Sequence, residues 1–105
     1  MQILVTFHDR RPSEQIAYAA RRAVEHALDR FRARIRDITV KIRDENAQKG
    51  GEDQLCSLAV RVEGGGEIHL HDRDSSAESA VHRLARRATR LVKGMVERRR
   101  RSRRS

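Results

Sequence analysis

The spacing of apolar residues changes along the chain, and each change marks a predicted element. Residues 1–8 alternate, with Ile3, Val5 and Phe7 on one side, which predicts a first strand. Ser13 is a candidate helix N-cap, and the apolar spacing of three and four residues that follows predicts a first helix over about residues 14–35. Its apolar face consists of Ile16, Ala20, Val24, Ala27, Leu28, Phe31 and Ile35.

Alternation returns in the middle of the chain and predicts three more strands. The first covers residues 38–43 and is followed by a polar, glycine-containing loop over residues 44–54. A second alternating run covers residues 56–62. The three glycines at 64–66 then predict a hairpin into a strand over residues 67–71.

The last apolar stripe predicts a second helix that starts at Ser75. Ser75 and Glu78 have the spacing of a capping box, in which each side chain bonds a backbone amide at the helix start. The stripe consists of Ala77, Ala80, Val81, Leu84, Ala88, Leu91, Val92 and Met95. Past Val96 arginines occupy the stripe positions, so we expect a single domain over residues 1–97. We expect residues 98–105 to form a basic tail that is disordered or, if the helix continues, has left the body.

The predicted order is therefore βαβββα, an α+β fold with two layers. Two amphipathic helices can cover one face of a four-stranded, mostly antiparallel sheet. A length of 105 residues fits one domain, and no repeat or linker marks a second. With only three aromatic residues, we expect an aliphatic, alanine-rich core.

Positive charge is concentrated at the C-terminal end. Residues 83–104 contain eleven Lys or Arg and one acid, while the rest is close to neutral, so the formal net charge of +9 resides here. The basic residues that share one flank of the predicted helix are Arg83, Arg86, Arg87, Arg90 and Lys93. Because residues 83–96 contain no acid, we expect this charge to stay uncompensated until a polyanion binds, the alternative being a solvated helix face.

Two further basic segments support a polyanionic partner, nucleic acid before anionic membrane. Arg21 and Arg22 belong to a second, weaker basic surface on the first helix. The tail arginines either solubilise the chain or bind phosphate without reading sequence. They include Arg98, Arg99, Arg100 and Arg101.

No set of residues supports catalysis, so we expect a protein that is not an enzyme and has no cofactor or metal. His69, His71 and Asp72 lie close together in sequence but lack a second ligand cluster, so exposed strand histidines are the better interpretation. The single Cys56 is expected to be a core residue. The absence of a disulfide, of a signal-peptide pattern and of a membrane span leads us to expect a cytoplasmic protein.

The middle of the chain carries the most specific sequence signal. The residues concerned are Asp44, Glu45, Asn46, Lys49, Gly50, Gly51, Asp53, Cys56 and Arg61. They resemble the DEN, KGG, D and C series of a divergent branch of the short ribosome hibernation promoting factors, also called protein Y or ribosome-associated inhibitor. The likeness covers nearly the whole chain, since the element order and the basic second helix also match. It implies a factor that binds the small ribosomal subunit, in the channel used by tRNA and mRNA, and holds ribosomes inactive under stress or in stationary phase.

The resemblance implies rRNA contacts for the five basic residues of the second helix and for Arg21 and Arg22. Where better-known members open that helix with Asp-Met-Tyr, this chain has Ser76, Ala77 and Glu78, so the Tyr and Met contacts are missing. Long members use a C-terminal extension to pair two ribosomes. This sequence has none, so we expect a monomeric chain that does not pair ribosomes alone.

Two alternative functions remain open at this stage, and one loop has two interpretations. The chain could be a general RNA or DNA binder, because its predicted architecture also resembles the double-stranded-RNA-binding fold. It could instead be a protein-interaction module for an acidic partner. The loop residues Lys49, Gly50 and Gly51 form either a flexible hairpin or a close backbone approach to rRNA.

Overall fold

The computed structural model describes residues 1–45 and 53–104 and contains the predicted elements in the predicted order. The strands are β1 (Gln2–His8), β2 (Ile35–Asp44), β3 (Gln54–Val62) and β4 (Glu67–Asp74). The helices are α1 (Glu14–Leu28), a short 3-10 helix η1 (Asp29–Arg34) and α2 (Ala77–Arg104). The strands lie side by side in the order β1-β2-β3-β4, with β1 parallel to β2 and the other neighbours antiparallel.

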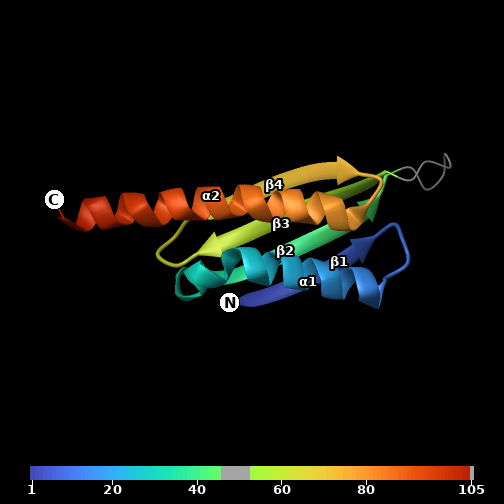
Figure 1. Ribbon diagram of the computed structural model, residues 1–105, viewed down its shortest axis with the longest axis horizontal. Helices are drawn as coiled ribbons and strands as arrows, with labels where there is room; N and C mark the ends of the chain where they lie inside the picture. The colour runs from blue at the N-terminus through green and yellow to red at the C-terminus, as the bar shows by residue number, and fades with distance from the viewer. Residues whose placement is uncertain (46–52, 105) are drawn as a thin grey trace.

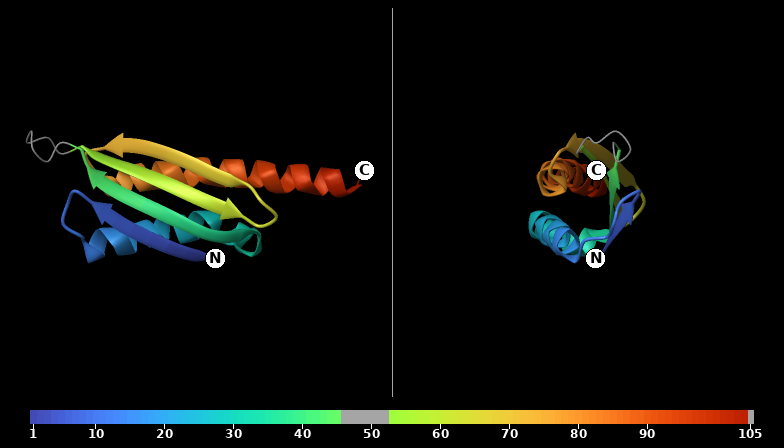
Figure 2. Two further views of the ribbon diagram at one scale, coloured as in Figure 1. Left: turned by 180° about the vertical axis from the view of Figure 1, so that it is seen from behind. Right: turned by 90° about the vertical axis from the view of Figure 1, so that its right-hand side faces the viewer.

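The fold is the two-layer α+β arrangement that the sequence predicts. Both helices lie on one face of the sheet, and the other face is left open (Figure 2). α1 and α2 run side by side in the same direction, and the C-terminal part of α2 extends beyond the sheet (Figure 1). This overhang lengthens the molecule to 56 Å along its longest axis.

The core lies between the sheet and the helices and is aliphatic, as predicted. The inward-facing residues of β2 and β3 are buried against small and aliphatic helix residues, and those of β1 are partly buried at the edge of the core. Those with least exposure include Ile38, Val40, Ile42, Leu58 and Val60 from the sheet, and Val24, Leu28, Leu84 and Val92 from the helices. Burial of each large side chain contributes about 1.5–3 kcal/mol. Cys56 belongs to this core, and burial raises the pKa of its thiol to about 11.

The first helix ends earlier than the sequence predicts. α1 stops at Leu28, and Ile35 is the first residue of β2 rather than the end of the helical face. The strand register shifts between Ile35 and Asp37, so both Ile35 and Ile38 are buried although they are three residues apart. A β-bulge therefore gives this segment the spacing of a helix.

The start of the second helix also differs from the prediction. β4 continues to Asp74, three residues further than expected, and α2 begins at Ala77. The capping side chain is Ser76, whose Oγ accepts a hydrogen bond from the Ser79 amide at 3.2 Å. Asp74 in turn accepts from the Ser76 amide at 2.8 Å. The capping box at Ser75 is thus misplaced by one residue, because Asp74 orients the chain immediately before the helix.

The far half of α2 contradicts two expectations. Leu91 is 45% exposed and lies outside the buried stripe, whereas Val96 is buried. The helix continues through Arg104, and the expectation that it leaves the body after Val96 is wrong at Arg99. It stays attached to the β3–β4 hairpin beyond Val96, because Arg99 donates hydrogen bonds to the carbonyls of Glu63 and Gly65.

Candidate nucleic-acid interface

The predicted basic residues of α2 lie outside the buried core. Most are exposed to solvent, and two, Arg83 and Arg99, are half-buried. The exposed ones are Arg86, Arg87, Arg90, Lys93, Arg98, Arg100 and Arg101. One stripe of α2 therefore packs against the core, while most of its basic side chains are exposed to solvent.

Arg83 is held by two carboxylates of β4. Its Nε lies 2.7 Å from Asp72 Oδ2, and its Nη1 lies 3.0 Å from Asp74 Oδ2. The hydrogen bond from Arg83 is the main cause that holds the pKa of Asp72 below its ordinary value. The pKa of Asp74 is lowered first by the Ser76 amide and then by Arg83. The expectation of uncompensated charge is therefore wrong at Arg83, because its acids come from a neighbouring strand.

Two other arginines of α2 contact backbone rather than acids. Arg87 Nη1 donates to the His71 carbonyl at 3.2 Å, and Arg99 bonds the hairpin as described above. Both keep their full positive charge, because a carbonyl does not neutralise a guanidinium. They are nevertheless less free than their neighbours to reorient toward a ligand.

The remaining basic side chains of α2 form what we call the unpaired basic face. Its members are Arg86, Arg90, Lys93, Arg98, Arg100 and Arg101. Across residues 1–45 and 53–104, none of them forms an ion pair. Because like charges on one rod add their potentials, this face is the part of α2 best suited to attract a polyanion.

The first helix brings two further cations to the same layer of the molecule. Arg21 and Arg22 are both exposed, and the Arg22 guanidinium lies 5.9 Å from the centre of the Tyr18 ring. Near the end of this helix Arg32 binds both Glu25 at 2.9 Å and Asp29 at 3.0 Å, so its guanidinium offsets part of their negative charge. The sequence analysis did not identify Tyr18 as a candidate. Its position one turn before Arg22 on the polar flank of the helix could have indicated that the two side chains are neighbours.

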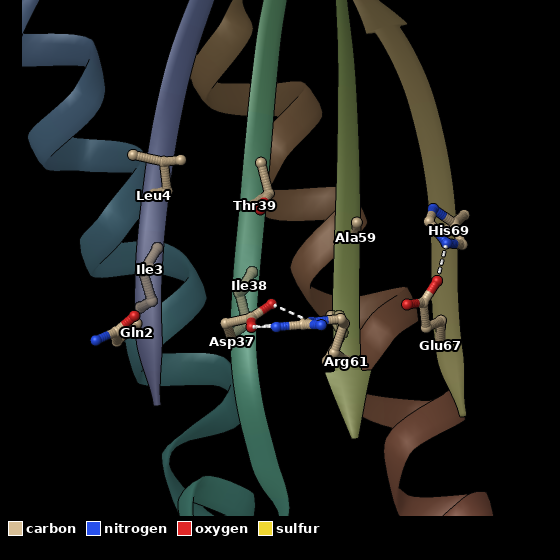
Figure 3. Close-up of a pocket in the computed structure, with 11 residues that line it drawn as sticks. Gln2, Ile3, Leu4, Asp37, Ile38, Thr39, Ala59, Arg61, Glu67 and His69 are labelled. Carbon is tan, nitrogen blue, oxygen red and sulfur yellow. Dashed lines mark hydrogen bonds and ion pairs between the residues drawn. The ribbon is translucent and has the colours of Figure 1, made fainter. Parts of the chain in front are cut away.

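The open face of the sheet has a different electrostatic character. It holds a depression of about 750 Å³. In this depression Arg61 pairs with Asp37 across β2 and β3, and His69 pairs with Glu67 along β4 (Figure 3). The Arg61 hydrogen bond holds the pKa of Asp37 below its ordinary value. Further pairs border this face, namely Arg43–Asp9 at 2.8 Å and Arg73–Glu45 at 2.6 Å.

The structure places the other candidate residues as follows. Within the described parts of the chain, no three His, Cys, Asp or Glu side chains come close enough to hold a metal ion. His69 and His71 are exposed, whereas Asp72 is bound to Arg83. Lys49, Gly50 and Gly51 lie outside the described residues. No helix in the described ranges has an apolar stretch of the length that a membrane span requires.

No protein-family model matches the sequence, and no curated protein matches it in sequence. Solved structures do match the fold. A ribosomal subunit interface protein from Coxiella burnetii is similar with a TM-score of 0.77 and 13% identity, over 92% of this chain and 99% of that one. The N-terminal domain of protein Y from Thermus thermophilus is similar with a TM-score of 0.74 and 16% identity, over 90% of this chain and 99% of the other. The resemblance drawn from the sequence is thereby confirmed at the level of the fold.

Proposed function

We propose that this protein binds the ribosome through small-subunit rRNA and keeps it inactive by occupying space that tRNA and mRNA need. The observation that carries the proposal is the unpaired basic face, displayed on a fold shared with a ribosomal subunit interface protein and with protein Y. Inhibition by occupancy needs no catalytic group. It needs a rigid body and a complementary surface, and the two-layer core and the basic helices supply these.

The residues that we assign to rRNA binding differ in their freedom to act. Arg86, Arg90 and Lys93 are exposed without an ion pair to any described residue, so they are the primary contacts in this proposal. Guanidinium groups suit RNA because they neutralise phosphate, offer a planar fork of donors and stack on unpaired bases. Arg83 has a structural role in addition, since it joins α2 to β4.

The overhanging end of α2 adds a sequence-independent contact. Arg98, Arg100 and Arg101 lie on a segment that extends past the sheet (Figure 1), so phosphates can reach them from several sides. Such contacts raise affinity and its salt dependence without reading bases. Specificity for the ribosome must therefore come from the shape of the body and from the part of α2 that lies over the sheet.

Sedimentation through sucrose gradients tests the proposal directly. Tagged protein is followed in lysates of growing and starved cells, with and without RNase and raised salt. We expect comigration with small subunits or whole ribosomes that increases in starvation and survives moderate salt. Protein that stays at the top of the gradient would contradict the proposal. Equal affinity for an arbitrary duplex, lost at moderate salt, would instead indicate a general nucleic-acid binder, and RNase-resistant capture by an acidic protein would indicate an interaction module.

A further inference from the structure

A groove between the two helices lies next to the unpaired basic face and has a composition of its own. It has a volume of about 1090 Å³ and runs along the line where α1 and α2 pack. Small side chains at Ala19, Ala23 and Ala85 line it, which leaves room between the helices. Thr89 fixes the spacing there, because its hydroxyl lies 3.1 Å from the Ala27 carbonyl of α1 and 2.9 Å from the Ala85 carbonyl of its own helix.

The larger side chains that line this groove are a tyrosine, arginines and histidines. Tyr18, Arg22 and Arg30 come from the α1 side, and His82 and Arg86 come from α2. The two acids of the lining, Glu25 and Asp29, are already bound by Arg32. Neither Arg22 nor Arg86 forms an ion pair with any residue in the described ranges. Counting Arg32, four arginines stand against two acids at this groove, so it carries net positive charge.

Tyr18 is unusual among the aromatic residues of this chain. Phe7 and Phe31 pack against the core, whereas Tyr18 is 60% exposed. The Arg22 guanidinium lies over its ring at 5.9 Å, and the remaining exposure leaves area for a second planar partner. An exposed aromatic ring flanked by arginines is a typical stacking platform for a nucleic-acid base.

We infer that the groove between α1 and α2 binds a single-stranded stretch of RNA, with one unpaired base stacked on Tyr18 and the adjoining phosphates held by Arg22 and Arg86. The inference rests on the proposed function and adds to it the form of RNA that this site takes. A duplex keeps its bases stacked inside the helix, so it can neutralise the arginines but cannot place a base on Tyr18. The groove thus selects unpaired RNA over duplex RNA.

The composition of the chain provides a direct readout. Tyr18 is the only tyrosine and there is no tryptophan, so the intrinsic fluorescence of the protein reports on this ring alone. A short oligouridylate is titrated into the full-length protein, and a parallel titration of N-acetyltyrosinamide corrects for absorption of the exciting light. We expect saturable quenching by the single strand and much weaker quenching by a duplex of the same length at equal occupancy.

Variants separate stacking from charge. Affinity is followed by the fluorescence anisotropy of a labelled oligouridylate. Tyr18→Leu should weaken binding about tenfold, whereas Tyr18→Phe, which keeps the ring, should bind like the wild type. Arg22→Gln should weaken binding. Its matched control, Arg43→Gln on the open face of the sheet, removes the same charge and should leave the affinity nearly unchanged.

Several results would overturn the inference. These are failure of the single strand to bind, binding without quenching, equal quenching by the duplex, or unchanged affinity of Tyr18→Leu. Cosedimentation of the same variants with ribosomes tests the proposed function separately from the groove. Comigration that depends on Arg86 and Arg90, without quenching of Tyr18, would contradict RNA binding in the groove and support the proposed ribosome binding. Quenching without comigration would support RNA binding in the groove and contradict the proposed ribosome binding.

Discussion

The open face of the sheet and the outer face of α2 both carry arginines, but they arrange them in opposite ways. On the sheet side each of three arginines has an acid in contact. The pairs are Arg43–Asp9, Arg61–Asp37 and Arg73–Glu45. On α2, Arg86, Arg90 and Lys93 have no such partner among the described residues. Paired charges largely cancel within a Debye length, whereas unpaired ones add, so pairing rather than the number of arginines decides which face attracts RNA.

The same contrast recurs within α2 itself. Arg83 and Arg86 lie one turn apart and look alike in the sequence. Arg83 is bound by Asp72 and Asp74, whereas Arg86 lines the groove beside α1 without an acid of its own. One arginine therefore joins the helix to the sheet, and the next is available to a ligand.

The largest expected effect comes from neutralising three cations of the unpaired basic face. Changing Arg86, Arg90 and Lys93 to Gln should lower ribosome affinity about 100-fold, since each phosphate contact contributes about 1 kcal/mol. The slope of log affinity against log salt should fall by about 2 to 3. Quantitative cosedimentation at several salt concentrations measures both quantities.

The matched control carries the same change of charge on the sheet side. Changing Arg43, Arg61 and Arg73 to Gln should alter ribosome affinity less than about threefold, because these cations are already neutralised. Circular dichroism checks that both triple variants are folded. If the two variants lose affinity equally, net charge alone would account for binding, and the contrast between the faces would have no functional meaning.

The β3–β4 hairpin, where the sheet touches the far part of α2, provides the next effect. A Cβ at Gly66 would lie 2.6 Å from Met95 Cε, and the residue has a φ of +115°. Gly66→Ala should therefore lower the free energy of unfolding by about 2 kcal/mol, since backbone strain adds to displacement of Met95. Urea denaturation measures the change.

Gly65→Ala is the control for that substitution. Gly65 has a φ of +93° but no atom within 4 Å of the added Cβ, so it tests backbone strain alone. The difference between the two variants should isolate the contact with Met95. Equal loss in both would mean that the terminal methyl group of Met95 moves away from the added Cβ without a measurable cost.

A smaller effect separates Arg83 from Arg86. Arg86→Gln should weaken RNA binding about fivefold and leave the urea midpoint unchanged, because the side chain has no described partner to lose. Arg83→Gln should lower the urea midpoint slightly and weaken RNA binding less than Arg86→Gln does, because Asp72 and Asp74 already offset much of its charge. Binding and denaturation of the same two proteins measure the contrast. The opposite pattern would assign the structural role to Arg86.

Periodicity predicted the core of this fold well because burial imposes it residue by residue. The inward residues of β3 alternate without interruption, from Cys56 to Val62, and all four are buried. Periodicity predicted element boundaries wrongly where two local structures give the same residue spacing. The bulge between Ile35 and Asp37 gives a strand the spacing of a helix, and Ser75 and Ser76 are equally plausible caps until Asp74 is seen to bind the Ser76 amide.

The sequence predicted which basic residues form the candidate interface, but not which of them are bound by acids and which are available to a ligand. Helical spacing places Arg83, Arg86 and Arg90 on one flank, which the structure retains. It does not reveal that β4 brings Asp72 and Asp74 against the first of them, because that contact joins elements whose relative position is set by the whole core. The groove with Tyr18 was missed for the same reason, since it requires two helices side by side.

The smallest expected effect is the dependence of the Arg83 contribution on pH. The pKa values of Asp72 and Asp74 are lowered in the folded protein, so their stabilising effect is present above the ordinary Asp pKa of about 3.9 and is lost as pH falls through the folded values. The urea midpoint of Arg83→Gln should therefore lie below that of the wild type at neutral pH and approach it in strong acid. Arg86→Gln should follow the wild type at every pH. A difference for Arg83→Gln that persists unchanged in acid would mean that its packing, and not its ion pairs, joins α2 to the sheet.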